Sequence, residues 1–422
     1  MKPKPSRLRW LLVVCALAFV ARAVAAMAIP AAPEVDAADY HMLAQSLAAD
    51  RGYVDDAGKP FGFQPPGYPV FVAAVYRVAG GAHPKAVYLA QAVLGAGSVA
   101  LIALLAAHFF GPSLGLAAGA VAAFYPMLIY ASRALMSENL YVFILLATLW
   151  AAVPLVEKRG GAGRAAAVGA LLGLGTLVRS ANIFVALVFG WWFLGQSMLG
   201  FRKKGALALV PVALVAACCA GTILPWTARN YVTFGHFVPV GTSDGLTLYA
   251  SYWPPLGPTG KRLWGKVTMP EDPVYAEAMK LENPAERSRF FRRKTLDGLR
   301  ADPFRIVKYL PEKLVFLFLP IDYEIWPHTP EAPRHVNWGY LLAFLPMVLG
   351  AAALWRVRDS RLAVWLLGVV PAATVAQALI FYGSPRFRAP LEAVFLVLVP
   401  AGALELSRLL QGKTRKSTRR SG

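Results

Sequence analysis

Residues 34–69 read EVDAADYHMLAQSLAADRGYVDDAGKPFGFQPPGYP and follow directly on the first long hydrophobic run of the chain. The stretch is rich in carboxylates, although most of the chain around it is apolar: it contains Glu34, Asp36, Asp39, Asp50, Asp55 and Asp56. Acidic side chains held beside lipid are costly unless they serve a purpose. The stretch therefore predicts a site at a membrane boundary, and catalysis on a substrate carried by lipid is the chemistry to weigh.

The composition indicates a membrane protein with many crossings. Of the 422 residues, 57% are hydrophobic and only 16% are charged, which leaves too little polar surface for a soluble protein of this size. The net charge of +20 lies mainly in short loops between apolar runs, a pattern typical of topology signals, so no nucleic-acid partner is predicted. Cys15, Cys218 and Cys219 all lie inside apolar runs and offer neither a disulfide framework nor zinc spacing.

About 20 apolar residues are needed to span a bilayer as a helix. Ten runs meet this expectation: 10–32, 84–109, 112–131, 138–156, 163–180, 181–200, 205–225, 338–355, 361–382 and 388–408. The first is long enough to span, so we interpret it as an uncleaved helix rather than a signal peptide. With the N-terminus in the cytoplasm, Lys and Arg gather in the inner segments 1–9, 157–164, 201–204, 356–361 and the tail after Arg408.

The runs divide the chain into four parts. Residues 1–225 form an N-terminal transmembrane module with a first outer loop at 33–84, and 226–337 form a small outer-face domain rich in α-helix. Residues 338–410 form the last transmembrane helices, and 411–422 form a basic cytoplasmic tail.

In the outer domain, Asn283-Pro284 and Asp302-Pro303 are typical helix starts and predict helices over about 284–300 and 303–319. The second helix ends in a short hydrophobic run. We place it at the outer membrane interface, as an amphipathic or re-entrant element.

In the first outer loop, a helix starting near Asp36 places Asp36 and Tyr40 one turn apart on the same face, with Asp39 beside them. We expect Gly52 to end this helix. The following turn, Gln64-Pro65-Pro66-Gly67-Tyr68-Pro69, is stiff because proline fixes its own φ and restricts the residue before it. A second surface helix over about 70–78 then holds the loop over the bilayer. The alternative is that these acids only cap helices and face water.

Arginine is disfavoured at the outer ends of membrane helices, yet several lie there: Arg133, Arg179, Arg229, Arg386 and Arg388. A phosphate is a fitting partner, because a guanidinium offers planar bidentate donors and stays charged. The alternative is that these side chains extend to lipid headgroups. Arg229, Arg386 and Arg388 stand among prolines and aromatics, which favours the phosphate role. Arg22, inside the first run, is either a further candidate or a structural partner of a carboxylate.

Glu138 stands at the outer start of the fourth predicted helix. An acid in a first helical turn, capped by Ser137 or Asn139, has a purely structural explanation. The functional alternative is a second carboxylate near Asp36 that orients substrate or binds a divalent cation. No nucleotide-binding glycine loop, HExxH motif or histidine cluster is present, so no protein-built metal site is predicted.

Taken together, these motifs resemble the bacterial membrane glycosyltransferases of the GT-C fold, in particular the family-39-type group of protein O-mannosyltransferases and lipid A aminoarabinose transferases. The matching pieces are Asp36-x-x-x-Tyr40, residues 65–69, Met136-Ser137-Glu138, Leu177-Val178-Arg179, residues 225–230, 237–240 and 245–249, and residues 386–390. They follow the family's order over nearly the whole chain.

The resemblance implies an all-α, GT-C-type bundle in the cytoplasmic (inner) membrane, with its active site facing the periplasm or the cell exterior. It implies inverting transfer of a sugar from a polyprenyl-phosphate carrier to a hydroxyl or amine of a glycan, lipid or protein. The family's essential aspartate corresponds to Asp36, with Asp39 as the second candidate. We expect Arg179, Arg229, Arg386 and Arg388 to bind the donor phosphate, and Tyr40, Tyr68 and Glu138 to position substrate. Relatives divide on whether a divalent cation is needed.

Other functions remain open on the sequence. A lipid-linked sugar transporter or flippase would place acids at mid-membrane between broken helices, whereas here they lie in an outer loop, and no inverted repeat is present. A non-catalytic partner in envelope assembly, or a ligase using a diphosphate-linked donor, is also compatible with the motifs.

Overall fold

The computed structural model describes residues 5–28, 36–157, 159–252, 272–320, 336–356 and 360–418. Helices are the only long elements in these ranges, and no strand is assigned there. The predicted all-α fold class is therefore confirmed for the described part of the chain. Glu34, one of the acids of the first loop, lies outside it.

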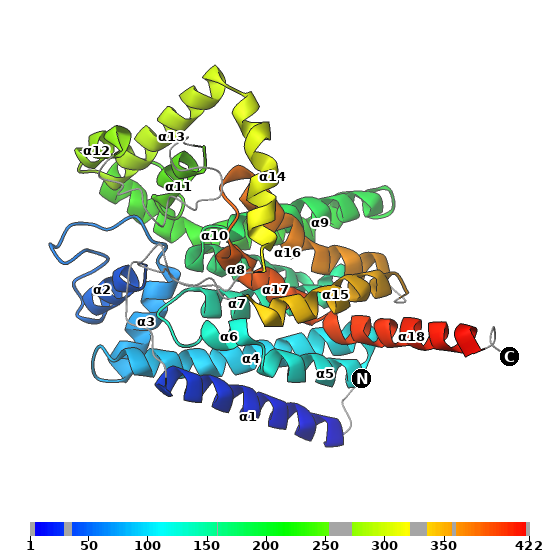
Figure 1. The fold of residues 1–422 in the computed structure, drawn as a ribbon. Helices are drawn as coiled ribbons and strands as arrows, with labels where there is room; N and C mark the ends of the chain where they lie inside the picture. The colour runs from blue at the N-terminus through cyan, green and yellow to red at the C-terminus, as the bar shows by residue number, and fades with distance from the viewer. Residues whose placement is uncertain are drawn as a thin grey trace.

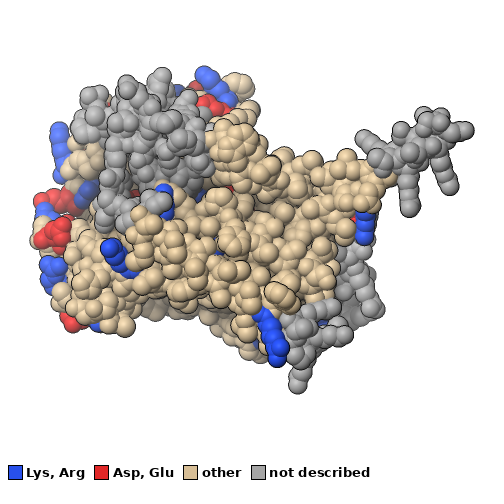
Figure 2. Space-filling model, turned by 60° about the horizontal axis from the view of Figure 1, so that its bottom comes forward, with Lys and Arg blue, Asp and Glu red and all other residues tan. Residues whose placement is uncertain are grey.

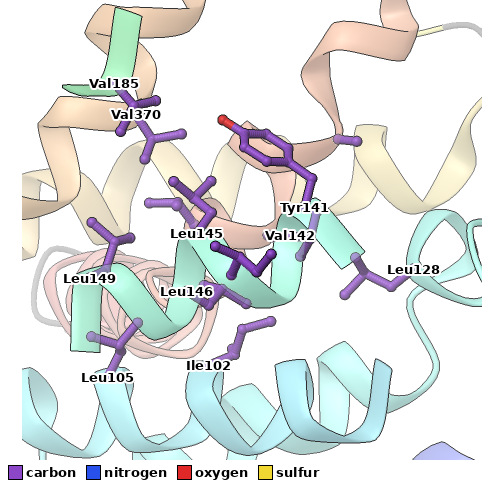
Figure 3. Close-up of a cluster of buried hydrophobic side chains, with 14 of the residues drawn as sticks. Ile102, Leu105, Leu128, Tyr141, Val142, Leu145, Leu146, Leu149, Val185 and Val370 are labelled. Atoms are coloured by element: carbon purple, nitrogen blue, oxygen red, sulfur yellow. The ribbon is translucent and has the colours of Figure 1, made fainter. Parts of the chain in front are cut away.

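Helix α7 (Glu138–Val156) lies at the centre of the bundle. Its apolar residues cover all sides, which is typical of a helix buried within a bundle. In Figure 3, Leu145, Leu146 and Leu149 of α7 lie among buried side chains that include Ile102 and Val370. The helices packed around it are α4 (Pro84–Phe110), α8 (Ala162–Val178), α16 (Ser360–Ile380) and α17 (Ala389–Leu396).

The remaining long helices form an outer layer that exposes many apolar side chains. The face drawn in Figure 2 shows a broad band almost free of charged residues, with acidic and basic groups gathered mainly at one end. This is the surface expected of a multi-pass membrane protein. The layer consists of α1 (Pro5–Ala28), α5 (Pro112–Ala123), α9 (Asn182–Lys204), α10 (Val210–Phe234), α15 (Trp338–Ala353) and α18 (Val399–Thr418), with the 3₁₀ turns η1 (Gly205–Leu209) and η3 (Leu354–Arg356).

Each of the ten predicted crossings contains a helix, but their lengths differ. Six helical segments in the described residues are long and apolar enough to cross a membrane, and a bent pair, Pro385–Leu396 with Val399–Gln411, makes a possible seventh. Three further apolar helices are shorter: Pro112–Ala123, Ala162–Val178 and Trp338–Ala353. The chain is thus a multi-pass membrane protein in which several predicted crossings are shorter or bent.

Two predicted crossings, 112–131 and 388–408, are interrupted by proline. The first ends at Ala123 and resumes as the short α6 (Pro126–Tyr130). The second bends by 64° between α17 and α18, close to Pro400. Proline has no N–H for the carbonyl four residues earlier, so each break frees backbone acceptors inside the bundle.

Arg22 satisfies the acceptors freed at the first break. Its side chain is fully buried, with Nη1 donating to the carbonyl of Ala123 at 2.9 Å and Nη2 to that of Ala122 at 3.1 Å. The sequence alternatives were a phosphate ligand or a partner of a carboxylate. Both are wrong, because the guanidinium donates to the backbone carbonyls at the end of a broken helix.

Replacing Arg22 with Leu is expected to destabilise the protein by about 2–3 kcal/mol, because two carbonyls at the helix break would lose the charged donor that they share in an apolar interior. Thermal unfolding in detergent measures this loss. An unchanged midpoint combined with lost phosphate binding would instead place Arg22 in the binding site.

The first outer loop contains the two predicted surface helices, α2 (Asp36–Ala48) and α3 (Gly67–Val78). Helix α2 is described from Asp36, the first described residue of the loop, and ends at Ala48 rather than at Gly52. Two residues later, Asp50 takes a positive φ of 58°. Helix α3 starts three residues earlier than expected, because Pro69 fits within a first helical turn. The two helices pack on each other and fix the position of Asp36.

The outer segment holds α11 (Ser243–Tyr252), α12 (Pro273–Met279), α13 (Pro284–Ala301) and α14 (Phe304–Phe318). Asn283 caps α13 as predicted, with its side chain accepting from the Ala285 N–H. Asp302 does not cap α14 and lies 3.5 Å from Arg305 instead, so that part of the prediction is wrong.

Two helices run across predicted part boundaries, and the boundaries themselves stay predictions. Helix α10 continues through Pro225 to Phe234 and so crosses the predicted boundary at 225. Helix α18 extends to Thr418, and the tail is therefore helical up to that residue. In Figure 1, α2 and α3 lie at the opposite end of the bundle from the turns α4–α5 and α15–α16 and the C-terminus.

Candidate active site

A cavity of about 390 Å³ opens at the end of the bundle that carries the first outer loop. Elements far apart in sequence form its wall, including α2, the Gln64 turn, the adjoining ends of α7, α8 and α9, helix α11, and the end of α16. Asp36, Tyr40, Arg179 and Arg386 all line it. The cavity thus brings together four of the residues predicted from sequence.

Asp36 contacts Arg386 directly. Its Oδ2 lies 2.7 Å from Nη1 of Arg386, and its Oδ1 accepts a hydrogen bond from Gln64 Nε2 at 3.2 Å. The exposed fractions of the two charged side chains are 17% for Asp36 and 19% for Arg386. An acid and a guanidinium separated by 350 positions are therefore brought together at the cavity wall.

Glu138 holds both arginines of the cavity. Its Oε1 lies 2.6 Å from Arg386 Nε and 2.7 Å from Arg179 Nη1, and the Glu138 side chain is only 2% exposed. Ser137 occupies the N-cap position of α7 but makes no capping bond, and its hydroxyl instead accepts from Arg179 at 3.1 Å. Glu138 therefore holds the two guanidiniums in place, and its predicted role in positioning substrate stays a prediction.

Gln64 links the acids of the first loop, and the sequence analysis did not single it out. Its Nε2 lies 3.2 Å from Asp36 Oδ1 and 3.4 Å from Asp39 Oδ2, while its Oε1 lies 3.3 Å from the Tyr40 hydroxyl. The Tyr53 hydroxyl in turn donates to the Gln64 carbonyl. The one sequence signal for this role is its place directly before Pro65-Pro66, in a turn whose backbone is fixed.

Tyr40 and Tyr68 play different parts. Tyr40 lines the cavity and lies within hydrogen-bond reach of Ser137, at 3.5 Å. Tyr68 is fully buried, donates to Gln91 at 2.7 Å and packs edge-on against Tyr40, with ring centroids 4.8 Å apart. Tyr68 is not among the residues that line the cavity and supports Tyr40, so its role in positioning substrate stays a prediction.

Asp39 does not line the cavity, although it shares Gln64 with Asp36. Burial raises the pKa of the Asp39 carboxyl to about 6, the bond from Gln64 lowers it, and the charge of Asp36 raises it again. Of the two predicted catalytic acids, only Asp36 faces the space where a substrate would bind.

The pKa of Asp39 makes a prediction about stability. Because the pKa of Asp39 is higher in the folded protein than the ordinary value of 3.8, ionised Asp39 makes the folded state less stable. This destabilisation disappears as the pH falls from above 6 to below 3.8 and the carboxyl becomes protonated. Asp39→Asn is therefore expected to be more stable than wild type at pH 8, by about 2 kcal/mol, and equally stable near pH 4. Thermal unfolding at both pH values measures this, and a difference independent of pH would contradict it.

Arg229 does not reach the cavity. Its guanidinium donates to the carbonyls of Phe61 at 3.1 Å and Tyr53 at 3.0 Å, and it lies over the Trp226 ring at 4.9 Å. The extension of α10 beyond Pro225 places it beneath the 53–61 turn. Arg229 thus anchors the first outer loop and is not among the residues that line the cavity, and its phosphate role stays a prediction.

Arg388 is also structural. It is fully buried in an ion pair with Glu392, donates to the carbonyl of Leu319 and lies 3.9 Å over the Tyr340 ring. Both arginines lie in the 3₁₀ turn η4 (Pro385–Arg388), which the Ser384 hydroxyl caps. In a 3₁₀ turn, side chains two residues apart point in different directions. Arg386 thus faces the cavity while Arg388 clamps the end of α14.

Asp36 and Glu138, considered together as possible ligands of a divalent cation, are both bonded to the guanidinium of Arg386. Within the described ranges, no group of three or more His, Cys, Asp or Glu side chains is placed to hold a metal ion.

Comparisons with known proteins bear on the fold. A family model described as dolichyl-phosphate-mannose-protein mannosyltransferase matches residues 63–226. The archaeal oligosaccharyltransferase AglB from Archaeoglobus fulgidus, solved with an inhibitory peptide and a dolichol-phosphate, is 14% identical with a TM-score of 0.57, over 97% of this chain and 52% of that one. The chain has a GT-C fold.

Two further solved structures are similar. The apo form of the Archaeoglobus fulgidus oligosaccharyltransferase gives a TM-score of 0.55 at 13% identity, over 96% of this chain and 52% of that one. ArnT from Cupriavidus metallidurans, bound to undecaprenyl phosphate, gives a TM-score of 0.44 at 16% identity, over 90% of this chain and 77% of that one. This chain spans about half the length of the oligosaccharyltransferases. No curated protein sequence matches it.

Proposed function

We propose that this protein is an integral-membrane glycosyltransferase that moves a sugar from a polyprenyl-phosphate carrier to an acceptor hydroxyl or amine. The observation that carries the proposal is the cavity wall on which a carboxylate, Asp36, faces two guanidiniums, Arg179 and Arg386. The GT-C fold and the match to the mannosyltransferase model over residues 63–226 support it.

The two arginines suit the phosphate of the carrier. Guanidiniums donate in a planar fork to phosphate oxygens, and donors fixed before the reaction stabilise the charge that develops on a leaving phosphate. Glu138, nearly excluded from solvent, holds both in place through contacts of 2.6 and 2.7 Å. A phosphate at the cavity wall would therefore meet two guanidiniums whose positions are fixed by Glu138.

The apolar part of the cavity suits a lipid. Ile183, Phe184, Phe381 and Phe387 line it, and the rings of Phe184 and Phe381 meet edge-on at 6.2 Å. These residues come from the start of α9 and the chain after α16, which lie beside each other in the bundle. A prenyl chain can enter between apolar helices while its phosphate stays at Arg179 and Arg386.

In the proposed step, the acceptor oxygen or nitrogen attacks the anomeric carbon of the sugar as Asp36 takes its proton. The bond from that carbon to the phosphate oxygen breaks, and the carrier phosphate leaves with the electron pair. A single displacement inverts the anomeric carbon. A positioned general base typically contributes ~10²–10⁴-fold to the rate.

We further propose that the cavity faces outward from the cytoplasmic membrane. The segments predicted to be cytoplasmic carry most of the basic residues of the short loops, and the turns α4–α5 and α15–α16 lie at the end of the bundle opposite α2 and α3. On that side nucleotide sugars are absent, so a lipid must supply the sugar.

A complementation experiment tests the function. In a strain lacking the gene, mass spectrometry of the lipid-linked sugars and of the envelope glycans should show one carrier-linked sugar accumulating and one modification missing. The intact gene should restore both, and an Asp36→Asn gene should restore neither. Lipid-linked sugar retained on the inner face, with transfer restored by Asp36→Asn, would favour a transporter instead.

A further inference from the structure

Asp36 has both carboxylate oxygens occupied. Oδ2 lies 2.7 Å from Arg386 Nη1, and Oδ1 accepts from Gln64 Nε2 at 3.2 Å. These two bonds use one lone pair on each oxygen and hold the carboxylate on the cavity wall, so Asp36 cannot turn towards a substrate while the contact with Arg386 lasts. In this arrangement the proposed base is therefore held by the same arginine that is proposed to bind the phosphate.

The two carboxylates on Arg386 are held differently. Glu138 is 2% exposed and also binds Arg179 at 2.7 Å, so it is fixed by two cationic partners. Asp36 is 17% exposed, borders the cavity and contacts Nη1 of Arg386. Glu138 keeps Arg386 in place if the contact with Asp36 is broken, whereas Asp36 is the partner that a ligand in the cavity can replace.

We propose that the carrier phosphate and Asp36 compete for Arg386, and that donor binding itself releases Asp36 to act as the base. This rests on the proposed function. A phosphate oxygen offers Arg386 Nη1 the same charge-assisted hydrogen bond that Asp36 Oδ2 now makes. Once replaced, Asp36 keeps its bond from Gln64 and remains beside the cavity, close to the sugar.

The exchange has two consequences for the reaction. Asp36 can turn towards the acceptor once the phosphate has replaced it on Arg386, so donor binding precedes activation of the acceptor. In addition, the negative charge of Asp36 weakens phosphate binding, because the phosphate must displace it. Removing a proposed catalytic acid should then tighten donor binding, which a merely structural role for Asp36 does not predict.

The test is the affinity for undecaprenyl phosphate, which carries no sugar, measured by calorimetry with the protein in nanodiscs. Asp36→Asn is expected to lower the dissociation constant about fivefold, the scale of a partly exposed ion pair. Asp56→Asn, which removes an exposed acid of the same loop, should change nothing. Arg386→Gln should weaken binding. Asp36→Ala serves as a second neutral variant, and thermal unfolding checks that each variant is folded.

The outcomes separate this inference from the proposed function. An Asp36→Asn or Asp36→Ala protein that binds the phosphate as wild type or more weakly overturns the competition, even if sugar transfer is lost. Tighter binding with full transfer activity supports the competition and overturns Asp36 as the base. Unchanged binding by Arg386→Gln removes Arg386 from the phosphate site and overturns the competition as well.

Discussion

Sugar transfer is expected to fall by ~10³-fold when Asp36 is replaced with Asn, which is the middle of the range for loss of a general base. Asn keeps the size of the side chain and can still accept from Gln64, so the fold of the loop should survive. The measurement is the rate at which a reconstituted protein removes radiolabelled sugar from a polyprenyl-phosphate donor extracted from the native membrane.

Two control variants sharpen this result. Asp56→Asn changes an exposed acid in the same loop and should transfer at the wild-type rate. Asp39→Asn should keep most of the activity, because Asp39 shares Gln64 with Asp36 but does not line the cavity. If Asp39→Asn were inactive and Asp36→Asn fully active, the base would be Asp39.

Arg386→Gln is expected to lower kcat/KM for the donor by ~10²–10³-fold, because a fixed donor to the leaving phosphate would be lost. Its matched control lies two residues away. Arg388→Gln should instead unfold the protein more easily, by about 3–5 kcal/mol, since it leaves Glu392 buried without its cationic partner. Kinetics of the folded fraction and thermal unfolding distinguish the two effects.

The contrast between these neighbours also checks the site assignment. If Arg388→Gln lost transfer while keeping its stability, and Arg386→Gln lost stability while keeping transfer, the roles given to the two arginines would be reversed. Arg229 can be checked in the same way. Its guanidinium donates to the carbonyls of Phe61 and Tyr53, so its replacement should destabilise the first outer loop.

The sequence predicted the helices well because membrane crossing imposes a simple rule of length and apolarity. It predicted a helix in the region of α2 and the cap at Asn283 for similarly local reasons. It did not predict the breaks near Pro126 and Pro400, since proline is tolerated in membrane helices when another group satisfies the freed carbonyls. Arg22 is that group at the first break, and only the packed structure reveals it.

For the site, residue type and topology were enough to select Asp36, Arg179, Arg386 and Glu138. They were not enough to separate Arg386 from Arg388, because the direction of each side chain depends on the 3₁₀ turn that carries them. The sequence did not indicate Gln64, because an uncharged amide gives no signal in the distribution of charges. Its role depends on Asp36 and Asp39, which approach it only in the folded protein.

The most direct test of the account is the position of the phosphate in a structure determined with undecaprenyl phosphate bound. The account predicts that the phosphate contacts Arg179 and Arg386 and that Asp36 has moved off Arg386 while keeping its bond from Gln64. A phosphate bound at Arg229 or elsewhere on the surface, with the contact between Asp36 and Arg386 intact, would contradict it.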